Sequence, residues 1–171
     1  MAKIFISFIH EEGEVAAALQ QLIRVKLERD DVFLASEWQI YAGEDWLQKI
    51  TAELRESKVV VLLLSPCSVR RPWVNFEAGG AWLASKVLIP VCHAGLTVEG
   101  LPKPYSSLQS LVIPDDIEYL ITSIYHHLHP PPMHLPLMPF PLDDPEVAEF
   151  RSVVERFNSR YQSGGDGNDC S

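Results

Sequence analysis

Residues 59–64 form the longest apolar run in the chain, and they restrict the possible folds more than any other segment. The run reads Val-Val-Val-Leu-Leu-Leu and lacks the alternation of a half-exposed strand. It is too short to cross a bilayer, and it is typical of a central β-strand covered on both faces. The sequence therefore predicts a parallel sheet with helices on both sides.

Other segments supply the remaining strands and the helices between them. The predicted strands are residues 3–8, 32–35, 58–64, 87–92 and 111–113. The predicted helices are residues 11–29, a helix capped by Asp45, a helix that begins at Pro72, and residues 115–127. Strands that alternate with helices imply right-handed crossovers. The predicted fold class is α/β, a flavodoxin-like five-stranded parallel sheet with helices on both faces.

A change in composition predicts where this domain ends. Residues 129–145 hold seven of the chain's 13 prolines, which favours a stiff linker after a domain of residues 1–128. Residues 146–162 then predict an amphipathic helix, with apolar residues three and four positions apart. This helix either packs on its own domain or binds a protein partner. Residues 163–171 predict a disordered tail.

Charge and cysteine usage exclude several classes of function. The chain has 14 basic and 23 acidic residues, a net charge of −9, so we expect neither nucleic acid nor a membrane as partner. The three cysteines form no CxxC pair and the Gly-Asp-Gly-Asn-Asp run lacks further calcium ligands, so no metal site is expected. The N-terminus lacks the features of a signal peptide, which favours a cytoplasmic location.

The topology rule for open α/β sheets predicts where a site would lie. Ligands bind beyond the carboxyl ends of the strands, here between the first and third, which selects residues 7–12 and 65–77. Trp73 and Glu77 stand four positions apart and share one helical face. Glu77 lies among apolar and small residues, where a buried carboxylate is costly unless something binds it. The alternatives are a surface carboxylate at a helix start and a core tryptophan. Gly79 and Gly80 predict close helix packing.

At this point the sequence resembles the Toll/interleukin-1 receptor (TIR) domain family, particularly its bacterial NAD+-cleaving members. The resemblance covers about residues 2–128, and its motifs follow one another in the family's order and spacing. The matching pieces are residues 4–10, Val32-Phe33-Leu34, Gly43-Glu44-Asp45-Trp46 with Ile50, Leu64-Ser65-Pro66, and Ser68 through Trp73 to Gly79. Ala42 stands where many members have proline, which weakens any transfer of the conformation of the Ser36–Asp45 loop.

The resemblance implies an NAD+ nucleosidase that releases nicotinamide and ADP-ribose or a cyclic isomer, in bacterial immune or stress signalling. Glu77 would be catalytic, and NAD+ would be the substrate, with no cofactor. Phe8 would lie in the nicotinamide pocket. The resemblance also implies a homo-oligomer or TIR–TIR assembly. Together with the topology rule it gives the expected substrate-binding residues Ser7, Phe8, His10, Gly43, Trp46 and Trp73.

Three other functions remain to be compared with this one. A non-catalytic TIR adaptor would use the same surface and the Ser36–Asp45 loop for protein contacts. A Cys–His hydrolase would use Cys67 and His10, which follow the third and first strands but lack an evident orienting residue. A response-regulator receiver fails, because Ser65 stands where a phosphorylatable aspartate is needed.

Overall fold

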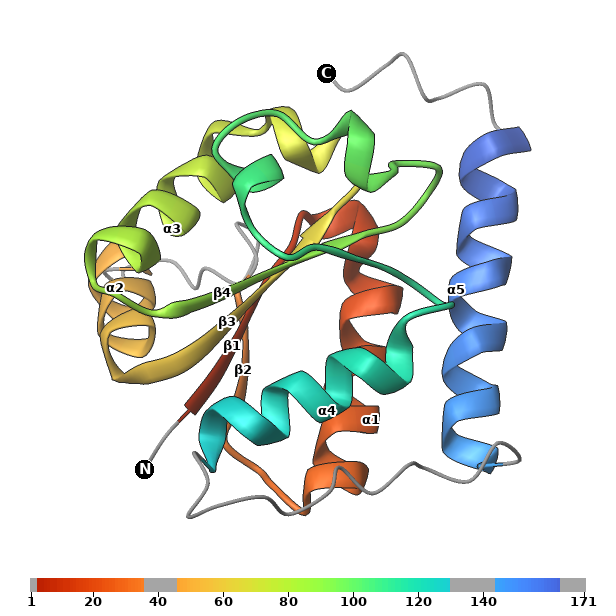
Figure 1. Ribbon diagram of the computed structural model, residues 1–171, viewed down its shortest axis with the longest axis horizontal. Coiled ribbons are helices and arrows are strands. Elements are labelled where there is room, and N and C mark those ends of the chain that lie inside the picture. The colour runs from red at the N-terminus through yellow and green to blue at the C-terminus, as the bar shows by residue number, and fades with distance from the viewer. Residues whose placement is uncertain (1–2, 36–45, 130–143, 164–171) are drawn as a thin grey trace.

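The computed structural model describes residues 3–35, 46–129 and 144–163, and it consists of one sheet with helices on both faces (Figure 1). The strands are β1 (Lys3–Ser7), β2 (Val32–Ala35), β3 (Ser57–Leu64), β4 (Val87–Cys92) and β5 (Leu111–Val112). The α-helices are α1 (Gly13–Leu27), α2 (Trp46–Glu56), α3 (Pro72–Leu83), α4 (Ile117–Leu128) and α5 (Pro145–Ser163). Short 3-10 helices are η1 (His10–Glu12), η2 (Ser68–Arg70), η3 (Val98–Gly100) and η4 (Tyr105–Ser107).

The sheet is parallel and has the strand order β2-β1-β3-β4-β5. This order confirms the predicted flavodoxin-like fold, in which the chain reverses its winding direction between β1 and β3. In β3 the side chains of residues 59–64 are all fully buried, as the unbroken apolar run predicts. The carboxyl ends of β1, β3 and β4 therefore meet at one edge of the sheet.

Helices cover the sheet as two separate layers (Figure 1). On one face, α1 and α4 pack against Ile4, Ile6 and Val61 in a first core cluster. On the other face, α2 and α3 pack against Phe5 and Val60 in a second cluster. Alternate residues of β1 thus point to opposite layers, as the two-residue period of a strand requires.

The predicted element boundaries agree with the structure to within two residues, and the first helix differs at both ends. The sequence predicted a helix from residue 11, whereas α1 begins at Gly13 after η1. Glu12 explains the difference, because its backbone N–H donates to the Ile9 carbonyl at 2.9 Å and its carboxylate accepts from the Ile9 N–H at 3.3 Å. These bonds close a separate turn ahead of the helix.

Helix α5 packs lengthwise on α1, as its position beside that helix in Figure 1 shows. Its apolar stripe of Val147, Phe150, Val154 and Phe157 is buried in the first core cluster. At its start, the Asp144 carboxylate accepts from the backbone N–H groups of Glu146 at 3.1 Å and Val147 at 3.2 Å, which caps the helix. Asp144 also pairs with Lys26 of α1. The apolar face that could have bound a partner is therefore covered by the domain itself.

Some expectations fall on residues outside the described ranges. These are the Ser36–Asp45 loop with Gly43 and the Asp45 cap, residues 130–143 of the linker, and the tail from residue 164. Of the helices in the described part of the chain, none is long and apolar enough to cross a membrane.

We predict that the Lys26–Asp144 pair contributes stability at neutral pH that disappears on acidification. The hydrogen bond from Lys26 lowers the pKa of Asp144 below its ordinary value. A folded-state pKa below the unfolded one adds stability that is complete above the unfolded pKa of about 3.9 and is lost as the pH falls through the folded pKa. Chemical denaturation of wild type and Asp144→Asn should therefore differ most near pH 7 and converge once the pH has fallen below the folded-state pKa of Asp144. A difference independent of pH would contradict this; Glu149→Gln, exposed on the same helix, is the control.

Candidate functional site

The candidate site is built around Glu77, a carboxylate with no exposed surface at the carboxyl edge of the sheet. Glu77 lies on the second turn of α3, and its Oε2 accepts a hydrogen bond from the hydroxyl of Ser7, the last residue of β1. Ser7 is likewise fully buried. An ionised carboxylate buried without polar partners would cost several kcal/mol or more, so the serine hydroxyl offsets part of that cost. The structure thus joins two predicted site residues that are 70 positions apart.

Helix α3 is held in place by contacts with its neighbour α2 and with the connection between β4 and β5. The Asn75 amide accepts a hydrogen bond of 2.6 Å from the buried hydroxyl of Tyr105 in η4 and donates one of 3.0 Å to the Arg71 carbonyl. A Cβ added to Gly80 would lie 3.2 Å from a Leu54 methyl, so α2 and α3 approach closely there. The close packing predicted from the paired glycines is confirmed at Gly80, and it is wrong at Gly79, which faces open space.

The start of α3 is also tied to the first strand's exit. Arg71 Nη2 lies 3.4 Å from Glu11 Oε1 of η1, and this pair is partly exposed to solvent. Ion pairs of this kind contribute about 0–1 kcal/mol to the free energy of unfolding, so this contact orients the Arg71 side chain more than it stabilises the fold. Arg70, the residue before Arg71, is exposed.

Trp73 and Phe8, both expected near the substrate, lie in different layers. Trp73 is one turn before Glu77 on α3, is partly buried against the second core cluster, and has its ring centroid 5.3 Å from that of Phe76. Phe8 is 4% exposed and packs in the first core cluster with Ile4 and Ile6, on the sheet face opposite Glu77. The structure therefore brings Trp73 into the neighbourhood of Glu77 and turns Phe8 away from it.

The remaining predicted substrate-binding residues are less closely defined. His10 is exposed at the start of η1, directly after the first strand's exit. Trp46 begins α2, but its side chain, like the whole of Gly43, lies outside the described residues. Their roles in binding stay predictions.

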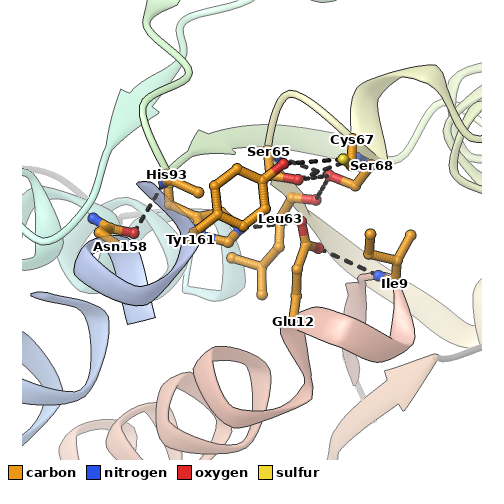
Figure 2. Close-up of polar contacts among 10 residues, drawn as sticks. Ile9, Glu12, Leu63, Ser65, Cys67, Ser68, His93, Asn158 and Tyr161 are labelled. Atoms are coloured by element: carbon orange, nitrogen blue, oxygen red, sulfur yellow. Dashed lines mark hydrogen bonds and ion pairs between the residues drawn. The ribbon is translucent and has the colours of Figure 1, made fainter. Parts of the chain in front are cut away.

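The sequence selected the segments that hold Glu12, Ser65 and Ser68, but it did not predict their contacts or the part that His93 takes in them. Glu12 and His93 are both buried, with Glu12 Oε1 3.3 Å from His93 Nε2, and the Glu12 carboxylate also holds the Ile9 N–H (Figure 2). Ser65 and Ser68 bond reciprocally: the Ser65 N–H donates to Ser68 Oγ at 2.7 Å, and the Ser68 N–H donates to Ser65 Oγ at 3.1 Å (Figure 2). The Ser-x-x-Ser spacing after the third strand was a usable signal for a local turn. Nothing local links Glu12 to a histidine 81 positions away.

The cysteines do not form an evident thiol centre with His10. Burial raises the pKa of Cys92 to about 11, which keeps this thiol protonated at neutral pH. Cys67 is 8% exposed and accepts a hydrogen bond from the Tyr161 hydroxyl at 3.0 Å. Cys67 is also disulfide-bonded, so it offers no free thiolate as a nucleophile, and His10 faces solvent.

The arrangement suits chemistry in which one carboxylate binds and stabilises a polar or cationic group. Glu77 lies in a dry environment, where electrostatic interactions are stronger than in water. A carboxylate oxygen there can accept a hydrogen bond from a substrate hydroxyl or stabilise a positive charge that develops nearby. The partly buried indole of Trp73 offers an aromatic face one turn away, which suits a cationic ring.

Comparison with known proteins gives a family match and likenesses of fold. A family model described as "TIR domain" matches residues 4–119. The structure is similar to a metazoan TIR-STING receptor from C. gigas, with a TM-score of 0.55 and 24% identity over 71% of this chain and 39% of that chain. The TIR domains of the activated Roq1 resistosome that recognises XopQ give a TM-score of 0.43 at 12% identity, over 99% of this chain and 95% of that one. No curated protein matches the chain.

These likenesses have defined limits. The chain spans about two fifths of the receptor from C. gigas, as the 39% coverage states, and at 24% identity the likeness concerns the fold alone. The TM-score of 0.43 supports no argument. The family match ends at residue 119, so α5 lies outside it.

We predict that Ser7 and Glu77 are energetically coupled. Ser7→Ala removes a donor from a buried carboxylate and should lower the free energy of unfolding by about 1–3 kcal/mol. In a double-mutant cycle with Glu77→Gln, measured by chemical denaturation, the two substitutions should be non-additive by about 1 kcal/mol or more. Ser110→Ala is the matched control, because the buried Ser110 hydroxyl bonds to the Leu108 carbonyl. Additive effects for Ser7 and Glu77 would show that the contact carries no net energy.

Proposed function

The chain belongs to the TIR domain family, and on that premise we propose that it is an NAD+ nucleosidase. It would cleave the nicotinamide–ribose bond of NAD+ and release nicotinamide together with ADP-ribose or a cyclic isomer. The observation that carries this proposal is the buried Glu77 carboxylate, hydrogen-bonded to Ser7 at the carboxyl edge of the sheet. A surface carboxylate at a helix start would be exposed, and Glu77 is not.

One carboxylate is enough for this reaction. Nicotinamide leaves a pyridinium as a neutral molecule, so its departure needs no general acid, unlike the leaving group of an ordinary glycoside. Glu77 would hold a ribose hydroxyl and stabilise the oxocarbenium charge at the anomeric carbon. Water then adds to that carbon and loses a proton, which gives linear ADP-ribose; attack from within the molecule gives a cyclic isomer instead.

The parts of the substrate would contact different residues around Glu77. We assign the aromatic face for the cationic nicotinamide ring to Trp73 rather than to Phe8, because Phe8 is 4% exposed and lies in the opposite layer. We assign the pyrophosphate to Arg71, because its pair with Glu11 holds it near the start of α1 and a guanidinium binds phosphate oxygens well. His10, Gly43 and Trp46 complete the proposed substrate-binding set.

The protein would work as an assembly. In the NAD+-cleaving TIR domains that this chain resembles, the loop after the second strand of a neighbouring copy completes the substrate pocket. In this chain that loop is Ser36–Asp45, which follows β2 in the sequence, and β2 pairs with β1 in the sheet. We therefore propose homo-oligomeric TIR–TIR contacts, a cytoplasmic location, and a role in bacterial immune or stress signalling.

We predict that Glu77→Gln abolishes NAD+ cleavage. The substitution keeps the side chain's size and one acceptor oxygen but removes the charge that stabilises the oxocarbenium ion, so kcat should fall by about 100-fold or more. The measurement is mass spectrometry of the products after incubation of the pure protein with NAD+ under crowding conditions, which also distinguishes linear from cyclic ADP-ribose.

The matched control for this substitution is Glu149→Gln, which removes one exposed carboxylate from α5 and should leave turnover unchanged. Circular dichroism of all variants checks that they are folded. A wild-type protein that is assembled and still inactive would favour the non-catalytic adaptor. Equal activity of wild type and Glu77→Gln would remove Glu77 from the reaction.

We predict that turnover per protomer depends on protein concentration. If a neighbouring copy completes the pocket, activity per protomer should rise with concentration and level off where sedimentation shows the assembled form. Initial rates measured across a dilution series, beside analytical ultracentrifugation of the same samples, test this. A monomer with full turnover at high dilution would contradict it.

A further inference from the structure

The end of α5 reaches around the edge of the sheet where the candidate site lies. Tyr161 packs against both core clusters, so its ring contacts the layers on both faces. It continues an aromatic row: the Phe157 ring lies 5.5 Å from the ring of His93, and the Tyr161 ring stacks on Phe157 at 6.0 Å. The family match ends at residue 119, so these α5 residues lie outside the matched region.

Tyr161 is bonded to the turn that leads into α3. Its hydroxyl donates to Cys67 Sγ at 3.0 Å (Figure 2). Cys67 lies between Ser65 and Ser68, whose reciprocal hydrogen bonds define the turn, and the Arg70 N–H donates to the Cys67 carbonyl at 3.1 Å. The chain then passes directly into the helix that carries Glu77.

Asn158 is bonded to the exit of β4. Its Oδ1 accepts a hydrogen bond of 3.0 Å from the N–H of Ala94, and a backbone N–H can only donate, which fixes the orientation of the amide (Figure 2). Ala94 has φ +54° and Gly95 has φ +87°, so the chain turns here through a conformation that alanine rarely adopts. A strained turn of this kind persists only where its surroundings hold it.

The same contacts extend to the exit of β1. His93, which precedes Ala94, lies against Phe157 on one side and 3.3 Å from Glu12 on the other. Glu12 in turn holds the N–H of Ile9, two positions after the Ser7 that bonds Glu77. One short segment of α5 therefore touches the exits of β3 and β4 directly and that of β1 through a buried pair.

Resting on the proposed function, we propose that Tyr161 and Asn158 are positioning residues, which hold the strand-exit turns so that Glu77 and Ser7 keep their mutual orientation. The surface ion pairs of α5, such as Arg156 and Arg160 with Glu14, are exposed and set no turn. The apolar stripe of α5 and the Lys26–Asp144 pair bind the helix to the domain, whereas the hydrogen bonds to the strand-exit turns come from Asn158 and Tyr161 in its last turns.

The test uses the full chain with Tyr161→Phe, Asn158→Ala and the double variant. Tyr119→Phe, which removes an exposed hydroxyl from α4, is the matched control. Hydrogen exchange of residues 65–71 and 92–95 is measured with α4 as internal reference, and kcat and KM for NAD+ are measured on the same samples. We expect faster exchange at residues 65–71 in Tyr161→Phe and at residues 92–95 in Asn158→Ala, with α4 unchanged.

We expect kcat to fall about two- to threefold in Tyr161→Phe, about fivefold in Asn158→Ala and about tenfold in the double variant. Falls of this size correspond to the loss of one or two neutral hydrogen bonds. KM should stay within about twofold of the wild-type value. Unchanged exchange in both turns overturns the inference. So does faster exchange with unchanged kcat, and so does an equal rise in α4, which would mean general destabilisation. If wild type does not cleave NAD+, the proposed function fails, and the exchange measurements alone decide whether α5 holds the turns.

Discussion

The hydrogen bond between Ser7 and the buried carboxylate of Glu77 is the interaction on which this structure depends. It joins the end of β1 to α3. These two segments lie close together because β3, which leads into α3, pairs with β1 in the sheet. A carboxylate without exposed surface lowers stability unless its partners and its local packing offset the desolvation. A chain that needed only a stable core at this position would be served by an apolar residue.

The surroundings of α3 fix the helix along its length. Arg71 meets Glu11 at its start, Asn75 meets Tyr105 in the next turn, and Gly80 lets α2 approach near its end. Each contact uses a different kind of interaction, and only the first is screened by solvent and salt. The orientation of Glu77 therefore depends mainly on contacts between neutral groups, which change little with ionic strength.

The sequence predicted the fold well because the signals for it are local. The unbroken apolar run of β3 and the helical spacing before and after it define the βα units, and the topology rule then locates the site. The Trp73–Glu77 spacing likewise requires only one helix. The side of β1 on which Phe8 lies was not predictable from the strand itself, because residues 4–6 are all apolar and give no alternation that assigns its faces. Ser7 shows which face of β1 points toward Glu77 only once the hydrogen bond between these two residues is known.

The parts of the site that sequence reasoning missed are those made by distant residues. Glu12 with His93, and Cys67 with Tyr161, each join positions that no periodic pattern relates. The apolar stripe of α5 predicted that the helix would bury one face. It did not predict the surface on which the helix packs, because an apolar stripe can pack on many apolar surfaces equally well. Polar bonds at the helix ends are directional, and they select one docking position among those that the apolar contacts allow. Asp144, through its pair with Lys26, and Asn158, through Ala94, thus fix the two ends of α5, and through Tyr161 this helix reaches the turn before Glu77.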